Sequence, residues 1–308
     1  MALGESTFQD VIFIAKNPAE PKVSLNLPPV ENQDCCVEPI VFASLSNTDP
    51  FENDKTSVIW IYDNGITNVE MKLQQWVGSS FIDVATLNNN TLGTAYLFGQ
   101  IQSVEGDNLV GYLIDWNKVL LALGLGTYRI QTTETTVFGS TVNQESDSWC
   151  LQEYNPNLVK GSVKIEWENS HIICGLNSGT QTFDFGTTKL AGEIRLQDSI
   201  FGFDSSTYER DFVKYQNKQK VWLKDIEEEN YILKTGRLTE DLHDYIKNFI
   251  LKGDNIKVTD YNQNNSRTHI QTKVIFSGDY APEYVSGSKL SKVELNFTNE
   301  FTIERKRC

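Results

Sequence analysis

The chain has 308 residues, and its 27 Lys and Arg against 41 Asp and Glu give a formal net charge of −14. This charge argues against a general nucleic-acid binder, which needs a basic face to displace the counterions of phosphates. Hydrophobic residues make up 39% of the chain. That is enough to form a core, so we expect one or two folded domains and not wholesale disorder.

We expect no signal peptide and no membrane insertion. The apolar run at residues 11–15 is short, and no stretch approaches the roughly 18 apolar residues of a membrane-spanning helix. The five cysteines are odd in number, two of them are adjacent and Cys308 is the last residue, which is a poor disulfide framework. Synthesis in a cytoplasm and free thiols are therefore expected, with a Cys150–Cys174 pair left open.

Residues 1–34 are predicted to form an extended N-terminal arm. Pro18, Pro21, Pro28 and Pro29 fall in this segment, half of the eight prolines of the chain. Proline lacks a backbone donor and fixes φ. We expect an arm or an edge strand that packs on something else, which in an assembly would be a neighbouring subunit.

Residues 35–145 are predicted to form a β domain. A strong hairpin signal, Asp63-Asn64-Gly65, follows the first β-branched run. One short helix is expected over about 116–123, because Asp115 is a good N-cap and Gly124 a good stop. Extended segments are expected at residues 57–62, 94–104, 109–114 and 128–137.

Residues 146–308 are predicted to form a β-rich domain with one packed helix. In the segment 163–168, Val163, Ile165 and Trp167 fall on one face of a strand, and the charged residues between them fall on the other. This period of two predicts a half-buried strand with a solvated charged face. Further strands are expected at residues 171–174, 180–185, 189–196, 256–259 and 270–276 and in a long terminal strand that includes Val293, Leu295, Phe297, Phe301 and Ile303.

The firm helix is predicted over about residues 240–252. Thr239 is a good N-cap and Gly253 can end the helix. One apolar stripe is formed by Leu242, Ile246, Phe249 and Ile250. The fold class is therefore mainly β, with antiparallel sheets or a β-sandwich, one firm helix and one short helix.

Two motifs match catalytic or cofactor patterns by letter only. Asp184-Phe185-Gly186 equals the kinase metal-binding tripeptide, but the other kinase motifs are missing from the sequence. Gly124-Leu125-Gly126 lacks the third glycine of a dinucleotide fingerprint. A strand that ends in glycine and a helix end explain these two segments.

Other candidate residues also have simple structural explanations. Glu166 and Glu168 beside Trp167 suggest a glycoside hydrolase, but a solvated strand face explains them as well. His171 and Cys174 have a metal-like spacing without a second ligand pair, and His243 and His269 stand alone in the sequence.

Three charged segments are further candidate sites. The acidic loop 47–54 lacks the spacing of a calcium loop. The runs 227–229 and 305–307 are interpreted as an exposed turn and an exposed terminus, with docking of the basic tail on an acidic patch of a neighbouring subunit as the sharper alternative. We assign no catalytic, cofactor-binding or metal-binding residue and expect no enzyme and no cofactor.

The last third of the chain resembles a known class of proteins. It contains Gly192-Glu-Ile-Arg-Leu196, Trp222-Leu-Lys-Asp225, Tyr231-Ile-Leu-Lys-Thr235, the capped helix, then Lys257-Val-Thr-Asp-Tyr-Asn262 and a basic end. This resembles tail structural proteins of phages that infect Bacteroidetes, including the crAss-like podoviruses. The resemblance covers roughly residues 185–308.

The resemblance implies a structural subunit of the virion tail, which forms an oligomeric ring or adaptor around the DNA conduit near the portal. It implies a cyclic homo-oligomer, with twelvefold symmetry usual at that place, and portal and tail proteins as neighbours. A strongly acidic subunit can line such a conduit without gripping phosphates, because like charges repel. No sequence-specific binding of nucleic acid is expected.

Two other functions remain open from the sequence. A receptor- or glycan-binding tail module would need an exposed aromatic platform, for which Trp149, Tyr154 and Trp167 are the candidates. A glycan hydrolase would depend on Glu166.

Overall fold

The computed structural model describes residues 11–14, 40–46, 48–62, 65–87, 94–102, 108–146, 148–176, 179–184, 189–214, 220–238, 240–262, 270–284, 290–301 and 303–306. It is mainly β with antiparallel sheets, which confirms the predicted fold class. Neither of the two longer helical segments in these ranges is long and apolar enough to cross a membrane.

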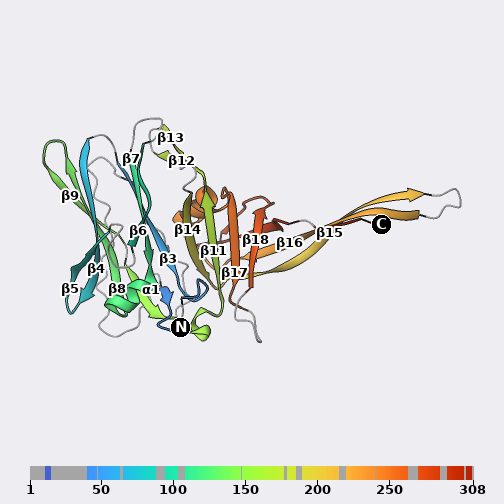
Figure 1. Ribbon diagram of the computed structural model, residues 1–308, viewed down its shortest axis with the longest axis horizontal. Coiled ribbons are helices and arrows are strands. Elements are labelled where there is room, and N and C mark those ends of the chain that lie inside the picture. The colour runs from blue at the N-terminus through green and yellow to red at the C-terminus, as the bar shows by residue number, and fades with distance from the viewer. Residues whose placement is uncertain are drawn as a thin grey trace.

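Two sheets pack face to face in the first half of the chain (Figure 1). The first sheet has the order β1 (Val11–Ile14), β3 (Lys55–Tyr62), β7 (Asn108–Asp115) and β6 (Thr94–Gln102). The second has the order β2 (Ile40–Ala43), β10 (Trp149–Glu153), β8 (Gly126–Thr136), β4 (Ile66–Val77) and β5 (Ser80–Thr86), with β9 (Thr141–Glu145) paired to β8. Side chains of both sheets share one buried core, so this half is a β-sandwich.

The short helix α1 (Trp116–Leu123) has the predicted bounds. The carboxylate of Asp115 accepts a hydrogen bond from the backbone N–H of Asn117 at 3.1 Å, and Gly124 ends the helix with φ of 89°. Because these caps are local, the sequence predicts this helix well. The indole of Trp116 is buried in the sandwich and donates to Thr56 Oγ1 at 2.8 Å.

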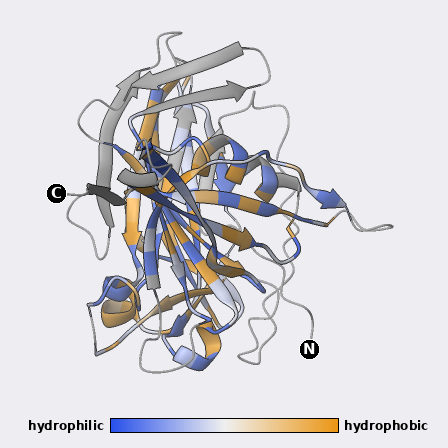
Figure 2. Ribbon diagram, turned by 90° about the vertical axis from the view of Figure 1, so that its right-hand side faces the viewer, coloured by the Kyte–Doolittle hydropathy of each residue, from blue (hydrophilic) through white to orange (hydrophobic). Residues whose placement is uncertain are grey.

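A third, larger sheet forms most of the second half, and Figure 2 shows hydrophobic and hydrophilic residues mixed along its strands. Its order is β14 (Leu190–Gln197), β11 (Ser162–Asn169), β17 (Asn255–Asp260), β18 (Ile270–Phe276), β21 (Glu294–Asn299), β16 (Lys220–Lys234) and β15 (Ile200–Lys214), with β22 (Ile303–Lys306) paired to β16. Two small sheets join β12 (His171–Leu176) to β13 (Gly179–Asp184) and β19 (Glu283–Tyr284) to β20 (Ser291–Lys292).

The predicted helix over 240–252 is α-helical only at its start. The segment α3 (Glu240–Tyr245) continues as the π-helix η1 (Ile246–Ile250), and the N–H of Leu251 bonds to the carbonyl of Ile246 at 2.9 Å. The rings of Tyr245 and Phe249 both pack on Trp167, with centroids 6.2 and 6.0 Å away. The predicted apolar stripe is buried against the sheet, and the expected cap Thr239 lies outside the described residues.

The predicted domain boundary at residue 145 is not where strand pairing changes. β10 follows that position but pairs with β2 and β8 in the sandwich. The change comes between β10 and β11, where the short helix α2 (Pro156–Val159) lies. Of the predicted arm at 1–34, residues 11–14 are described, and they form an edge strand that pairs in parallel with β3 of the same chain.

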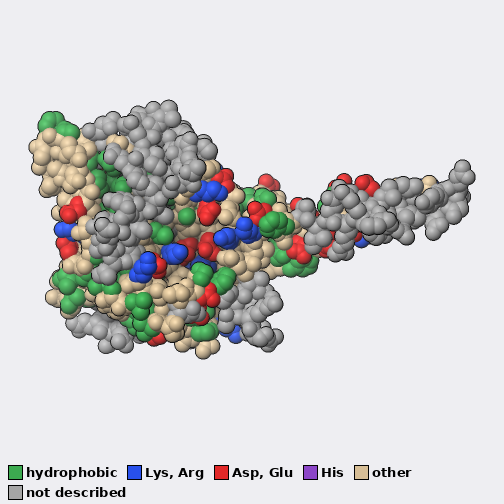
Figure 3. Space-filling model, viewed as in Figure 1, with side chains coloured by type: hydrophobic (Ala, Val, Ile, Leu, Met, Phe, Trp, Pro, Cys, Tyr) green, Lys and Arg blue, Asp and Glu red, His purple; other side chains and the backbone are tan. Residues whose placement is uncertain are grey.

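The strands β15 and β16 form a long hairpin that leaves the body of the molecule (Figures 1 and 3). The sequence did not predict this hairpin. The run 227–229, expected in a turn, lies in the middle of β16, and β22 pairs with residues 224–227. The basic residues 305 and 306 therefore lie on a strand that pairs with β16 of their own chain.

The predicted terminal strand is divided into β20, β21 and β22. Val293, Leu295 and Phe297 are buried, as the alternation predicts. Phe301 is 65% exposed, because β21 ends at Asn299 before this residue.

Candidate functional site

The sandwich and the large sheet meet along a seam formed by β3 and β14 (Figure 1). Ser57 Oγ of β3 donates to the carbonyl of Ala191 in β14 at 2.6 Å. The carboxylate of Glu193 accepts a hydrogen bond from the backbone N–H of Lys55. Every second residue of a strand points to the same face, so residues 55 and 57 turn away from the sandwich core and towards the second half.

A buried ion cluster lies within this seam. Arg195 holds Asp54 in a bidentate pair, with Nη2 to Oδ1 at 2.6 Å and Nε to Oδ2 at 3.2 Å. Lys164 Nζ lies 3.7 Å from Asp54 Oδ1 and donates to the carbonyl of Pro50 at 2.7 Å. The side chains of all three charged residues are at most 1% exposed. Asp54 is 141 residues away from Arg195 along the chain, so this cluster joins the two halves.

The charges in the cluster stabilise one another. Burial alone would raise the pKa of Asp54, but attraction to Arg195 and Lys164 outweighs burial and lowers this pKa below its ordinary value. Burial disfavours the charged form of Lys164, yet attraction to Glu193, Tyr261 and Asp54 raises its pKa. Charged groups that are removed from water need such partners.

The pKa of Glu193 is shifted in the opposite direction to that of Asp54. Burial raises its pKa to about 8, with Lys164 as an opposing influence and Asp54 as a reinforcing one. Burial thus outweighs the attraction of Lys164 for the ionised carboxylate.

An aromatic ring completes the cluster. The guanidinium of Arg195 lies 4.4 Å from the ring centroid of Tyr261, within range of a cation–π contact. The Tyr261 hydroxyl donates to the carbonyl of Phe51 at 2.6 Å. Another hydrogen bond thus ties the loop before Asp54 to the large sheet.

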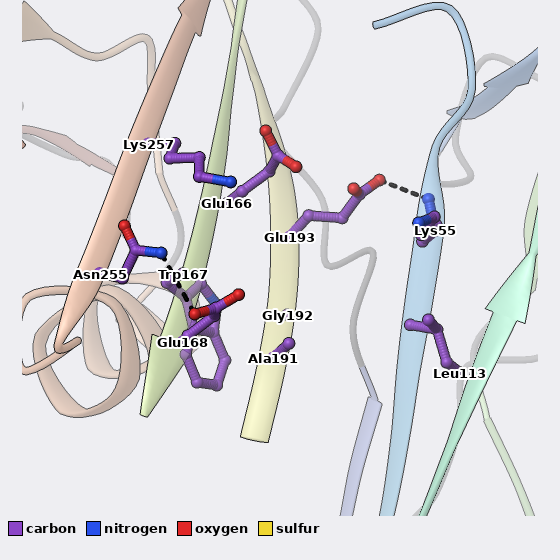
Figure 4. A pocket seen from close by; sticks show the side chains of 10 residues that line it. All are labelled: Lys55, Leu113, Glu166, Trp167, Glu168, Ala191, Gly192, Glu193, Asn255 and Lys257. Atoms are coloured by element: carbon purple, nitrogen blue, oxygen red, sulfur yellow. Dashed lines mark hydrogen bonds between the residues drawn. The ribbon is translucent and has the colours of Figure 1, made fainter. Parts of the chain in front are cut away.

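A pocket of about 170 Å³ opens beside the cluster (Figure 4). Its lining residues are Lys55, Leu113, Glu166, Trp167, Glu168, Ala191, Gly192, Glu193, Asn255 and Lys257. Glu166 accepts a hydrogen bond from Gln271 Nε2 at 2.5 Å, and Glu168 accepts one from Asn255 Nδ2 at 3.1 Å. The two carboxylates are therefore on one face, as predicted.

The prediction that the charged face of β11 is solvated is only partly correct. Glu166 and Glu168 are half-buried at the pocket, and Lys164 on the same face is fully buried. The difference arises from tertiary packing, because the sandwich covers the charged face of β11.

The hairpin carries a second candidate surface. Phe203, Tyr208 and Phe212 of β15 are 59%, 48% and 55% exposed. The Tyr208 hydroxyl donates to Glu227 at 2.8 Å, and the guanidinium of Arg210 lies 5.0 Å from the Tyr208 ring. Among the described strands, β15 ends the order of its sheet and has β16 as its one partner. Within the described residues, β15 is therefore an edge strand that carries half-exposed aromatic side chains.

His243 lies in a polar group that sequence reasoning missed. Its Nε2 is 2.5 Å from Ser291 Oγ, and its Nδ1 is 2.5 Å from the Tyr280 hydroxyl. A serine beside a histidine is the arrangement of a nucleophile and its base. Ser291 is only 1% exposed, so a substrate cannot reach its hydroxyl and the group is a buried structural network.

The proposed aromatic platform is corrected by burial. Trp149 is 1% and Trp167 2% exposed, since each belongs to the core of its half. Tyr154 is half-buried and packs against the small cluster of Phe42 and Tyr261.

None of the remaining sequence candidates in the described part of the chain lines the seam pocket. Asp184 ends β13, and Gly124 and Gly126 flank the end of α1 and the start of β8. His171 and Cys174 lie on β12, with side chains outside the description, as are residues 185, 186 and 269. Within the described ranges no group of three or more His, Cys, Asp or Glu is arranged to hold a metal ion.

Cys150 differs from the expectation of free thiols, because it is disulfide-bonded.

No protein-family model, curated protein or solved structure matches the chain.

Proposed function

We propose that the protein is a structural subunit of a phage virion tail, which forms a ring or adaptor around the DNA conduit near the portal. The observation that carries this proposal is the β15–β16 hairpin. It leaves the body of the molecule (Figure 1), and the aromatic side chains of Phe203, Tyr208 and Phe212 on it are 48–59% exposed. Exposed apolar surface of this kind is typical of a protein–protein contact.

The seam supports the same role, because a ring subunit must hold its contact surfaces in a constant relative position. The Asp54–Arg195 pair and the hydrogen bonds around it connect the sandwich to the sheet that carries the hairpin. A contact between two different surfaces of identical subunits can then close into a ring.

The role that we propose is structural and not catalytic. The carboxylates of the pocket are engaged in the fold: Glu193 accepts from Lys55, Glu166 from Gln271, and Glu168 from Asn255. The net charge of −14 suits a subunit that lines a DNA conduit without binding the phosphates, because like charges repel. The alternative of a glycan-binding module loses its two main residues, Trp149 and Trp167, which are buried.

The test is the mass of the purified protein by native mass spectrometry and light scattering, at low and at high concentration and with the portal protein of the same phage. A large closed species, or a monomer that forms rings only with the portal protein, supports the proposal. A stable monomer or trimer that ignores the portal protein contradicts it.

A further inference from the structure

We propose that the outer half of the β15–β16 hairpin of one copy docks on the inner half of the same hairpin of a second copy, basic surface against acidic surface. The outer half comprises residues 210–214 of β15, 220–225 of β16 and 305–306 of β22. The inner half lies nearer the body (Figure 1) and comprises residues 205–209 of β15, 226–230 of β16 and 303–304 of β22. This inference rests on the proposed oligomer and names the contact that builds it.

The charge of the hairpin changes sign along its length, between residues 209 and 210 of β15. The strand register places six basic and two acidic residues in the outer half: Arg210, Lys214, Lys220, Lys224, Arg305 and Lys306 against Asp211 and Asp225. It places five acidic residues and no basic residue in the inner half: Glu209, Glu227, Glu228, Glu229 and Glu304. The net charges of the two halves are therefore +4 and −5, which makes each half the electrostatic complement of the other.

Like charges occupy opposite positions in the outer half. Lys214 is directly opposite Lys220 in the register of β15 and β16, and Lys224 is directly opposite Lys306 in the register of β16 and β22. Lys214 is exposed. Like charges directly opposite each other destabilise a sheet. An acidic surface of a partner would offset this repulsion, so the outer half gains from such a contact.

Glu229 in the inner half is held by neutral hydrogen-bond donors. The Tyr231 hydroxyl donates to its carboxylate at 2.7 Å, and Asn299 Nδ2 donates at 3.0 Å. Glu209 is exposed and Glu228 is half-buried. Neutral donors satisfy hydrogen bonds without cancelling the charge of a carboxylate. The inner half therefore presents negative charge to a partner.

The hairpin buries little of its own surface. From Phe203 to Phe212, every residue of β15 except Ser206 is exposed. A two-stranded hairpin is marginally stable at best in water, and an edge strand is a template for contact with another chain. The hairpin leaves the body of the molecule (Figures 1 and 3), so a second copy can reach both of its halves.

A second copy fits the hairpin better than nucleic acid does. Phosphates would be attracted by the outer half but repelled by the inner half, which begins at the next residue of β15, about 3.3 Å along the strand and well within a Debye length of about 8–10 Å. A second copy uses both halves in one kind of contact, and every copy carries both. Because the outer and inner halves are different surfaces, the contact is heterologous and can close into a ring.

The first experiment mixes two variants that each keep one half intact. Lys214→Glu with Lys220→Glu removes the net positive charge of the outer half, and Glu209→Lys with Glu228→Lys removes most of the negative charge of the inner half. Each double variant alone should need a concentration about tenfold higher to assemble, which corresponds to about 1.4 kcal/mol. The mixture should form one-to-one pairs at the concentration at which the wild type assembles, because the intact outer half of one variant meets the intact inner half of the other.

Native mass spectrometry and light scattering measure this assembly, with and without the portal protein. The matched control is Lys118→Glu with Lys160→Glu, because both lysines are exposed outside the hairpin and the net charge changes by the same amount. This control should assemble like the wild type. A mixture that pairs no better than either variant alone would overturn the proposal, and so would variants that assemble like the wild type.

The second experiment locates the contact directly. A photoreactive benzoylphenylalanine at position 214 should cross-link to peptides of an isotopically labelled second copy that contain residues 226–230. Cross-links to another surface, or to a different virion protein, overturn the inference while oligomerisation itself, and with it the proposed function, stands. A protein that stays monomeric with and without the portal protein overturns both.

The third experiment tests nucleic acid as the occupant, with a 30-base-pair DNA duplex as the probe in a gel-shift assay. The wild type should not shift this duplex at physiological salt. Binding that is lost in the variant Lys214→Glu with Lys220→Glu, while assembly is unchanged, would assign the outer half to phosphates and overturn the proposed contact between copies.

Discussion

Arg195 and Asp54 form a bidentate ion pair across the seam, with Nη2–Oδ1 at 2.6 Å and Nε–Oδ2 at 3.2 Å, and both side chains are shut away from water. One residue belongs to β14 and the other to the loop that enters β3. The pair therefore links the sandwich to the sheet that carries the hairpin.

Removing one partner of this pair should be costly. Asp54→Ala leaves Arg195 and Lys164 buried without their shared anion, and we expect a loss of about 3–5 kcal/mol in the free energy of unfolding. Chemical denaturation measures this loss. The control is Glu294→Gln. Glu294 Oε1 lies 3.0 Å from Lys234 Nζ in an exposed ion pair. Exposed pairs contribute at most about 1 kcal/mol, so this variant should lose little stability. Equal small losses in both variants would show that the seam is not held by this pair.

Glu193 should make stability depend on pH. Its pKa is raised from 4.5 to about 8 by burial, so between these values the folded protein binds more protons at this position than the unfolded protein. The contribution is complete below about pH 4.5 and is lost as the pH rises through about 8. The pKa of Asp54 is lowered, so this residue makes stability depend on pH only in the more acidic range.

The variant Glu193→Gln keeps an acceptor for the N–H of Lys55 and removes the titration. Its free energy of unfolding should fall less between pH 5.5 and pH 8.5 than that of the wild type. Parallel pH profiles for the two proteins would contradict a raised pKa. Glu166→Gln, at the half-buried mouth of the same pocket, is the control.

Gly236 has no room for a side chain. A Cβ at this position would lie 2.6 Å from the backbone oxygen of Gln197 and 3.0 Å from Asp198 Cβ. Gly236→Ala should therefore destabilise the protein by about 1–3 kcal/mol, the usual cost of overpacking. The matched control is Gly202→Ala, where a Cβ meets nothing within 4 Å. Thermal unfolding should show a lower Tm for Gly236→Ala than for Gly202→Ala. An unchanged Tm for Gly236→Ala would contradict the prediction.

Trp149 should behave as a core residue. Its ring packs on Trp116 with centroids 5.7 Å apart, and it is 1% exposed. Trp149→Ala should cost about 3–5 kcal/mol. Trp76, which is half-buried and stacks edge-on against Phe81, is the control and should cost less when it is changed to Ala. A fully stable Trp149→Ala variant that has lost binding to a glycan array would instead restore the glycan-binding alternative.

Local patterns predicted the elements that depend on local physics. The cap Asp115 and the stop Gly124 bound α1, and Val163, Ile165 and Trp167 turn inwards from β11 as their alternation requires. The π-helical turn at Ile246 has no such sequence signal, because it depends on how the rings of Tyr245 and Phe249 pack on Trp167.

Strand alternation and helix caps act over a few residues, so they predict a mainly β protein with two helical segments. The burial of Lys164, the pairing of Asp54 with Arg195 and the raised pKa of Glu193 come from tertiary packing. These properties arise where two sheets meet, between residues more than 100 positions apart. Burial of charge depends on what covers a face, and a strand pattern shows only which residues share that face.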